Sequence, residues 1–430
     1  ESLFEKEGLI DFIKKNTAEQ IEAEAEKIKE EAVQLKDTII ADRRYLHTHP
    51  ETGFDLTETK AYVKKELISM GYEPIDCGKA GLVVNAGGKK PGRVFLIRGD
   101  MDALPIREEA DVDFASDSGR MHACGHDMHT SMLLGAARIL KQHEDEIQGT
   151  IKLMFQPAEE IFEGSRDMIE AGVLKNPDVD AALMIHVMAG MPFEAGTVIV
   201  SAPGVSAPAA DYFNIKVQGK GCHGSMPNTG VDPLNAAAHI LIALEEISAR
   251  ELAMSDQAVL TIGTMNAGVA ANVIPDTVDM GGSIRTFDEE TRAFIKERMT
   301  EIAEGIAKSF RAEAEVTFGS GCPTLVNDKD LSINAEKYVK ELLGAQRTFS
   351  VAQLAAMSTG RQSSKSAGSE DFAYVSHEVP SIMLALAAGQ PDKGYRYPQH
   401  HPMVKFDEEA LTSGCAVYAY TAMRWLEEHK

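Results

Sequence analysis

The segment MHACGHDMHT at residues 121–130 holds the densest group of side chains in the chain that are able to do chemistry. It places Cys124 and His126 two residues apart, with His122, Asp127 and His129 beside them. Thiolate, imidazole and carboxylate groups together favour a divalent transition metal such as zinc, manganese or cobalt. The alternative interpretation is the polar start of a helix, where an acid is favoured near the positive N-terminus. The density of ligand types in so short a segment favours the metal site over that alternative.

A second motif, FQPAEE at residues 155–160, places two acids after an expected strand and a proline turn. Because adjacent side chains point in different directions, one carboxylate of Glu159 and Glu160 is able to bind metal while the other stays free. A free carboxylate beside a metal is suited to act as a general base toward water. In isolation the pair would be interpreted as the acidic first turn of a helix. The metal cluster elsewhere in the chain favours the catalytic interpretation.

Three further segments hold candidates for the same site. His186 ends the apolar strand ALMIHV, and the ends of strands are where sheets of this kind build their sites. A buried core histidine is the alternative there. His400 and His401, in YPQHHP, offer another ligand. Asp100 and Asp102, in RGDMDALP, lie on one side of an extended strand, where one of them would orient a ligating imidazole unless the segment is simply a turn.

A separate group of candidates lies in the middle of the chain. Glycine on both sides of His223, in GKGCHGSMP, predicts an exposed loop that contacts a substrate oxygen or is an ordinary surface turn. Asn272, in ANVIP, and Arg285, in GGSIR, belong to the same part of the chain. An arginine at a strand end suits a substrate carboxylate, although it is also common on solvated strand ends. The sequence has no HExxH, GxSxG or GxxxxGK[ST] motif, so it indicates none of the classes that depend on them.

The elements that must position these residues follow from hydrophobic periodicity. Apolar residues recur at helical spacing over 21–39, which predicts an amphipathic helix that packs on a core or on a partner. Short apolar strands are expected at 82–86, 94–99, 151–156 and 182–187, with a helix from about His129 between the second and third. Strands that are apolar on both faces predict a central sheet covered by helices, an α/β fold.

The order of elements changes after residue 207. We expect a strand at 212–217, a helix at 233–250, strands at 259–265 and 278–285, a helix at 288–311 and a strand near Val316. This β-α-β-β-α-β order is that of a ferredoxin-like α+β domain. The sequence therefore predicts a smaller domain at 208–320, inserted into a larger α/β domain that is formed by 1–207 and 321–430.

Composition narrows the classes of function. The 430 residues include 66 acids and 43 lysines and arginines, a formal charge of -23, which opposes binding to nucleic acid or to an anionic membrane. No apolar run approaches the roughly 20 residues of a membrane span, and the start of the chain does not resemble a signal peptide. Five widely spaced cysteines do not form a disulfide framework and suit a reducing cytoplasm. We therefore expect a cytoplasmic protein that binds neither nucleic acid nor a membrane surface.

Taken in order, the motifs resemble those of a known family. RGDMDALPI, HACGHDMHT, FQPAEE, IHV, GKGCHGSMP, ANVIP, SIRT and GSEDFAY are together similar to the metal-dependent amidohydrolases of the aminoacylase/carboxypeptidase family. The similarity is greatest to the branch with hippurate hydrolase, N-acyl-amino-acid hydrolases and plant indole-acetyl-amino-acid hydrolases. The resemblance implies a two-metal enzyme that hydrolyses the amide bond of N-acyl amino acids. A dipeptidase or carboxypeptidase on the same fold is the alternative, followed by a non-catalytic binding protein.

The resemblance also implies roles for individual residues. One metal would be held by Cys124, His126 and His186, and the other by Cys124, Glu160 and His400, so that Cys124 bridges the two ions. His401 is the alternative to His400, and Glu159 would be the general base that activates the metal-bound water.

The inserted domain would serve as a lid or dimerisation domain in a homodimer or homotetramer. In dimers of the family, the residue matched by His223 reaches the active site of the other subunit. Asn272 and Arg285 match positions near the substrate carboxylate or carbonyl.

Overall fold

The computed structural model describes residues 3–357 and 368–430, with side chains at 17–356 and 368–430. The chain divides into two compact units. The first comprises Glu1–Gly204, Val326–Ser364 and Val375–Lys430, and the second comprises Val205–Leu325 and Lys365–Tyr374. The segment expected to form an inserted domain, 208–320, lies within the second unit. Each unit is described by itself below.

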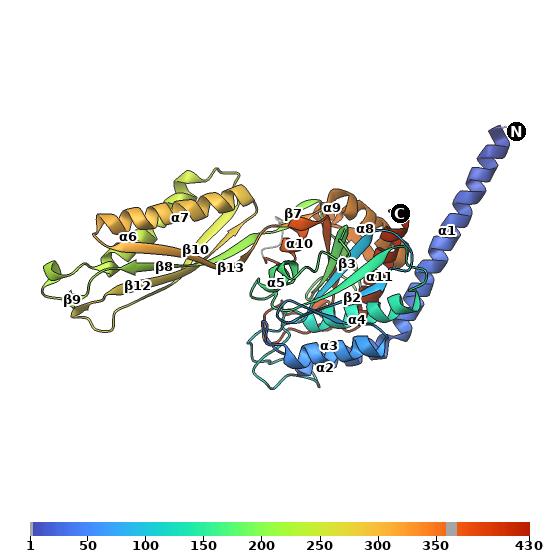
Figure 1. The fold of residues 1–430 in the computed structure, drawn as a ribbon, viewed down its shortest axis with the longest axis horizontal. Coiled ribbons are helices and arrows are strands. Elements are labelled where there is room, and N and C mark those ends of the chain that lie inside the picture. Colours follow the sequence, from blue (N-terminus) through green and yellow to red (C-terminus); the bar gives the residue numbers. More distant parts are fainter. Residues whose placement is uncertain (1–2, 358–367) are drawn as a thin grey trace. The chain divides into compact units, whose positions relative to one another are not determined.

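The first unit is built on an eight-stranded mixed sheet (Figure 1). Its strands are, in sheet order, β1 (Ile75–Cys77), β2 (Gly81–Gly87), β4 (Thr150–Gln156), β3 (Val94–Asp100), β5 (Ala181–Met188), β16 (Ser381–Ala387), β6 (Val198–Val200) and β15 (Thr348–Ser350). Strand β3 runs parallel to β4 and β5, and β5 runs parallel to β16. All seven residues of β3 are buried, as expected for a strand covered on both faces.

Helices flank this sheet. They are α1 (Leu3–Gln34), α2 (Lys36–Thr48), α3 (Thr57–Ser69), α4 (His126–Gln142), α5 (Gly164–Glu170), α8 (Lys329–Leu343), α9 (Val351–Met357), α10 (Ala373–Glu378) and α11 (Ala410–Glu428). Helices α4 and α11 pack against each other and are buried along most of their length. The prediction of an α/β fold with a helix-covered central sheet is confirmed.

Two helix boundaries differ from those predicted. The helix expected over 21–39 is divided at Leu35, so that α1 ends at Gln34 and α2 begins at Lys36. The periodicity continues through this point because buried residues of both helices face the same core, and hydrophobic spacing alone does not reveal the division. Helix α4 begins at His126 rather than near His129, which places both histidines on one helix.

The second unit contains a four-stranded antiparallel sheet in the order β10-β12-β8-β13. Its elements are β8 (Ala209–Gln218), α6 (Pro233–Glu246), β10 (Ala258–Ala267), β12 (Thr277–Thr286), α7 (Glu289–Ser309) and β13 (Glu313–Cys322). Burial alternates along β8, and its buried residues pack with those of α6 and α7 in one core. Element order and strand order together are those of a ferredoxin-like sandwich.

The remaining elements are short. They are β7 (Gly204–Ala207), β9 (Cys222–His223), β11 (Val273–Ile274), β14 (Leu325–Asn327) and the helical turns Pro227–Thr229, Ile247–Glu251, Ala345–Arg347 and Pro391–Lys393. Among the helices formed by residues 3–357 and 368–430, none combines the length and apolar character needed to cross a membrane.

Candidate metal centre

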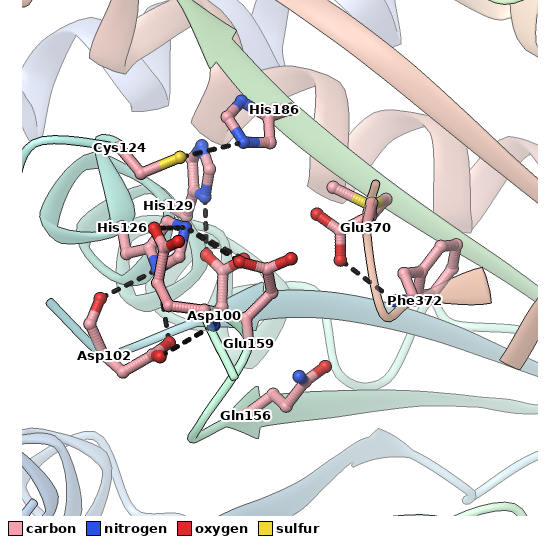
Figure 2. A network of polar contacts seen from close by, with 12 residues as sticks. Asp100, Asp102, Cys124, His126, His129, Gln156, Glu159, His186, Glu370 and Phe372 are labelled. Atoms are coloured by element: carbon pink, nitrogen blue, oxygen red, sulfur yellow. Dashed lines mark hydrogen bonds and ion pairs between the residues drawn. The ribbon is translucent and has the colours of Figure 1, made fainter. Parts of the chain in front are cut away.

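The topology of the first unit explains why motifs distant in sequence meet. Strands β3, β4 and β5 are neighbours and run parallel, so their carboxyl ends lie at one edge of the sheet. Asp100 ends β3, Glu159 and Glu160 follow β4, and His186 lies near the end of β5. Helix α4 starts at the same edge with His126, as Figure 2 shows.

The structure gathers the five residues predicted as metal ligands into two groups. Ligand atoms of Cys124, His126 and His186 lie within 4.8 Å of one another, and so do those of Cys124, Glu160 and His400. The two groups share only Cys124, whose Sγ lies 3.6 Å from His186 Nε2. A thiolate between two groups of nitrogen and oxygen ligands is the arrangement that a bridging role requires.

Two buried atoms of these groups lack a hydrogen-bond partner among the described residues. They are Nε2 of His126 and Oε1 of Glu160. A buried polar atom without a partner costs about 1–3 kcal/mol, so such atoms normally bind a further group. Imidazole, carboxylate and thiolate ligands within reach of one another fit a divalent transition metal such as zinc, manganese or cobalt.

The side chains around Cys124 change its acidity in the metal-free chain. Burial opposes ionisation of the thiol and Glu160 adds to this effect, but His186 and His126 outweigh both and bring the pKa of Cys124 to about 7. Hydrogen bonds to Cys124 and Glu160 raise the pKa of His400 to about 10. Cys124 and His400 therefore have pKa values in a range where protons compete with a metal ion for the same ligand atoms.

Asp102 contacts two of the proposed ligands, His126 and Glu160. Nδ1 of His126 lies 2.8 Å from the Asp102 carbonyl oxygen and 3.3 Å from its Oδ1. The backbone N–H of Glu160 donates to Asp102 Oδ2 at 3.0 Å. With these contacts, Asp102 is able to orient the His126 imidazole and the backbone of Glu160, which is the supporting role predicted for one of the two aspartates.

Asp100 contacts His129, a histidine that the sequence did not single out as a supporting residue. Its carboxylate accepts from Arg98 at 2.8 Å and lies 2.6 Å from Nδ1 of His129. Nε2 of His129 accepts the backbone N–H of Val187 at 2.9 Å, directly after His186. Burial lowers the pKa of His129 to about 4, which agrees with a neutral ring that donates at Nδ1 and accepts at Nε2. The sequence feature that could have pointed to His129 is its position three residues after His126, which places both side chains on one face of a helix.

Glu159 is nearly buried beside the two groups that share Cys124. Its Oε2 lies 3.7 Å from Nε2 of His126, and its ligand atom is within 4.8 Å of those of His126 and Glu160. Ala158, just before it, has a φ of 54°, in the left-handed region that non-glycine residues rarely adopt. Strain of this kind persists where the surrounding structure fixes a functional side chain.

In the second unit the structure brings His223 and Asn272 together. His223 pairs with Val273 in the β9–β11 ladder, and the carbonyl oxygen of Asn272 accepts from the backbone of Gly224 at 2.8 Å. Nδ1 of His223 accepts the backbone N–H of Ser225 at 3.1 Å. A neutral His223 then carries its proton on Nε2, where it can be donated to a substrate oxygen.

Arg285 lies on the four-stranded sheet of this unit, at the end remote from the β9–β11 ladder. It pairs with Ala210 near the start of β8, whereas Thr277 pairs with Gln218 at the end from which the chain continues to His223. Ala210 and Gln218 are separated by about 26 Å at the usual rise per residue of a strand. Within this unit the structure therefore does not bring Arg285 together with His223. Nη1 of Arg285 is buried without a hydrogen-bond partner among the described residues, which suits an anionic group.

Comparison with known proteins agrees with the class that this fold and site define, a metal-dependent hydrolase of amide bonds. The model of peptidase family M20/M25/M40 matches residues 96–424. The chain therefore belongs to this family, and the two-metal enzyme implied by its motifs is confirmed at the level of the family.

Individual relatives are similar over most of their length. The chain is 36% identical to an N-acetylcysteine deacetylase of Bacillus subtilis, over 91% of this chain and 98% of that protein. It is 40% identical to an N-acyl-L-amino acid amidohydrolase of Geobacillus stearothermophilus, over 70% of this chain and 81% of that protein. A dinuclear metal-binding M20 peptidase of Bacillus subtilis superposes with a TM-score of 0.73 at 34% identity, covering 92% of this chain and 99% of that structure.

Proposed function

We propose that this enzyme hydrolyses the amide bond of N-acyl amino acids. The observation that carries the proposal is the pair of ligand groups that share Cys124, with the carboxylate of Glu159 beside them. A metal-storage or structural metal site has no use for an additional nearly buried carboxylate at this position. The named activities of the deacetylase and amidohydrolase relatives support this class of substrate.

The metals and Glu159 have separate tasks in this reaction. Two divalent ions held by the proposed ligands would lower the pKa of water and polarise the amide carbonyl. Glu159 takes a proton from the attacking water and returns it to the leaving nitrogen. The buried position of its carboxylate keeps that proton away from bulk solvent during the transfer.

Residues of the second unit are proposed to contact the substrate. His223 donates its Nε2 proton to the oxyanion that develops on the substrate. Arg285 binds the carboxylate of the amino acid, and Asn272 lies beside His223 to contact the same substrate. Because Arg285 lies at one end of the four-stranded sheet and His223 follows the strand that leaves its other end, one small substrate cannot touch both within a single unit. We therefore propose that His223 and Asn272 act on the active site of another subunit.

The assembly that this requires is a homodimer, or a homotetramer built from such dimers. We also propose that it works in the cytoplasm. All five cysteines are free, including Cys124 at the proposed centre, and a thiolate ligand is preserved in a reducing compartment.

A screen of substrates tests this proposal. Enzyme stripped of metal and reloaded with zinc, manganese or cobalt is assayed on N-acetyl, N-benzoyl and indole-acetyl amino acids and on dipeptides with a free amino group. We expect kcat/KM for at least one N-acyl amino acid to exceed that for every dipeptide by tenfold or more. Preference for dipeptides would reassign the enzyme as a dipeptidase or carboxypeptidase. A metal-loaded chain that turns over neither class would be a binding protein.

A further inference from the structure

A buried network of charged side chains joins helix α2 to the first turn of helix α4. Oδ2 of Asp127 lies 2.8 Å from Nε of Arg43 and 2.8 Å from Nδ1 of His47. Nε2 of His47 lies 2.9 Å from Oε1 of Glu108, in the segment between β3 and α4. The side chains of all four residues are at most 3% exposed. Burial of four ionisable groups is costly unless each is paired, so the arrangement is not incidental surface charge.

The geometry fixes the protonation state of His47. Both of its ring nitrogens face carboxylate oxygens, which accept hydrogen bonds and do not donate them. A neutral imidazole has only one donor, so both bonds require the imidazolium form. Burial alone would lower the pKa of His47, but hydrogen bonds to Asp127 and Glu108 outweigh it and raise the pKa. The four side chains then carry two positive and two negative charges.

One arm of the network ends beside the proposed metal ligands. Asp127 follows His126 in the sequence and lies in the first turn of the helix that the ligand loop enters. The other arm reaches the segment that carries His400. Glu108 accepts a hydrogen bond from the backbone N–H of Ser116 at 2.6 Å, which holds the loop that contains both residues. In the same loop, the backbone N–H of Glu109 donates to the Pro402 carbonyl at 2.8 Å. His400 in turn donates its backbone N–H to the carbonyl of Ala123 at 2.9 Å.

We propose that His47 is a positioning residue of the metal centre, which holds the segments bearing Cys124, His126 and His400 in their metal-binding arrangement. It touches neither metal nor substrate and acts through Asp127 and Glu108. This inference rests on the metal ligands of the proposed function. It adds that metal binding also requires His47, a residue of helix α2 that lies outside the ligand motifs.

The chain offers a matched control at the opposite end of α4. His143 also lies between two carboxylates, with Nδ1 2.9 Å from Glu146 and Nε2 2.8 Å from Glu31. It is buried as well, at 2% exposure. Neither carboxylate belongs to a segment that carries a proposed ligand. A histidine that matters only for folding would behave like this one.

The experiment compares four variants of the full-length enzyme. His47→Asn places an amide N–H near the position of Nδ1 and keeps a donor toward Asp127, whereas His47→Gln places it near Nε2 and keeps a donor toward Glu108. His143→Asn and His143→Gln are the controls. Zinc affinity is measured by competition with a chromophoric chelator, and stability of the metal-free chains by thermal unfolding.

We expect both His47 variants to raise the zinc dissociation constant by about tenfold, the lower end of the effect of residues that support metal ligands. His47→Asn should lose less zinc affinity than His47→Gln, since it keeps the hydrogen bond to Asp127, the residue next to His126. The His143 variants should lose comparable thermal stability and keep wild-type zinc affinity. If the His47 variants do not fold, Arg43→Lys takes their place in the same comparison. It retains the charge but loses the planar guanidinium, which bonds Asp127 through Nε and Glu408 through Nη1.

Wild-type zinc affinity in the folded His47 or Arg43 variants would overturn the positioning role. An equal loss of zinc affinity in the His47 and His143 variants would also overturn it, because the loss would then follow from lower stability of the fold in general. The readout does not involve substrate. An enzyme that binds zinc as described but cleaves no N-acyl amino acid would refute the proposed function and leave the role of His47 intact.

Discussion

At the scale of single residues, the proposed centre depends on groups whose ordinary acidity has been changed by their neighbours. The thiol of Cys124 has a pKa of about 7, and the imidazole of His400 has a pKa of about 10 in the metal-free chain. Both groups are protonated below these values, and a metal binds only their deprotonated forms. Metal binding therefore releases protons, and it must weaken as the pH falls.

This linkage predicts a pH dependence of metal affinity. Between pH 6 and 9 the zinc dissociation constant of the wild-type enzyme should fall as the pH rises, by about tenfold per pH unit for each proton released. Calorimetric titration in buffers of different ionisation enthalpy counts those protons directly. The variant Cys124→Ser, which removes the thiol, should release fewer. Zinc affinity that is constant over this range would contradict the assignment of Cys124 and His400 as ligands.

The residues of this centre differ in how far the sequence revealed them. Cys124, His126 and the two glutamates were conspicuous because ligand types are dense in short motifs. His129 and His47 were not singled out as supporting residues, because their roles depend on partners that are close only in the folded chain, the Val187 amide and Asp127. Spacing along the sequence carries no information about such contacts.

At the scale of elements, one glycine allows the ligand loop to enter helix α4. Gly125, between Cys124 and His126, has a φ of 91°, a conformation that L residues with a side chain rarely adopt. A Cβ at this position would lie 2.4 Å from Cγ2 of Val187, the residue after His186. The turn thus brings the loop against β5, which places three proposed ligands side by side.

Gly125→Ala is predicted to damage stability and metal binding together. The left-handed backbone costs about 1–2 kcal/mol and the overlap with Val187 about 1–3 kcal/mol more. Gly119→Ala is the control, because Gly119 also has a positive φ, 78°, but a Cβ there meets nothing within 4 Å. Thermal unfolding and zinc titration of both variants check this prediction. Equal behaviour of the two would show that close packing at Gly125 is unimportant.

The elements themselves were largely predictable. Strands β3, β4 and β5 agree with the expected ranges to within a residue or two at each end, because continuous apolar runs mark buried strands. The division at Leu35 and the start of α4 at His126 were not predicted. The sheet order, with β4 between β2 and β3, is set by pairing over long sequence separations and was not expected from the sequence.

At the scale of the whole molecule, the formal charge of -23 overstates the negative field of the working enzyme. Asp100, Asp102, Asp127 and Glu159 are buried, and each lies among cationic groups, hydrogen-bond donors or proposed metal ligands rather than at the surface. Two divalent ions per chain would offset four of the negative charges. The remaining acids are mostly solvated.

The separation of His223 from Arg285 within the second unit leads to a prediction about subunits. A His223→Ala chain and a Glu159→Gln chain should each be nearly inactive as homo-oligomers. After subunit exchange, mixed dimers contain one site with an intact Glu159 and a His223 from the other chain. Random pairing should then restore about one quarter of wild-type activity. Absence of recovery, once exchange has been demonstrated by mass spectrometry, would remove the cross-subunit role of His223.

The most direct test of the proposed mechanism is one variant with two readouts. Glu159→Gln removes the base and preserves the shape of the side chain, and metal content and kcat are measured on the same preparation. We predict two metal ions per chain, as in the wild type, with kcat lower by about a thousandfold or more, as expected for loss of general-base catalysis. Wild-type turnover with both metals bound would contradict the assignment of Glu159 as the base. Loss of a metal ion would show that Glu159 is a ligand instead.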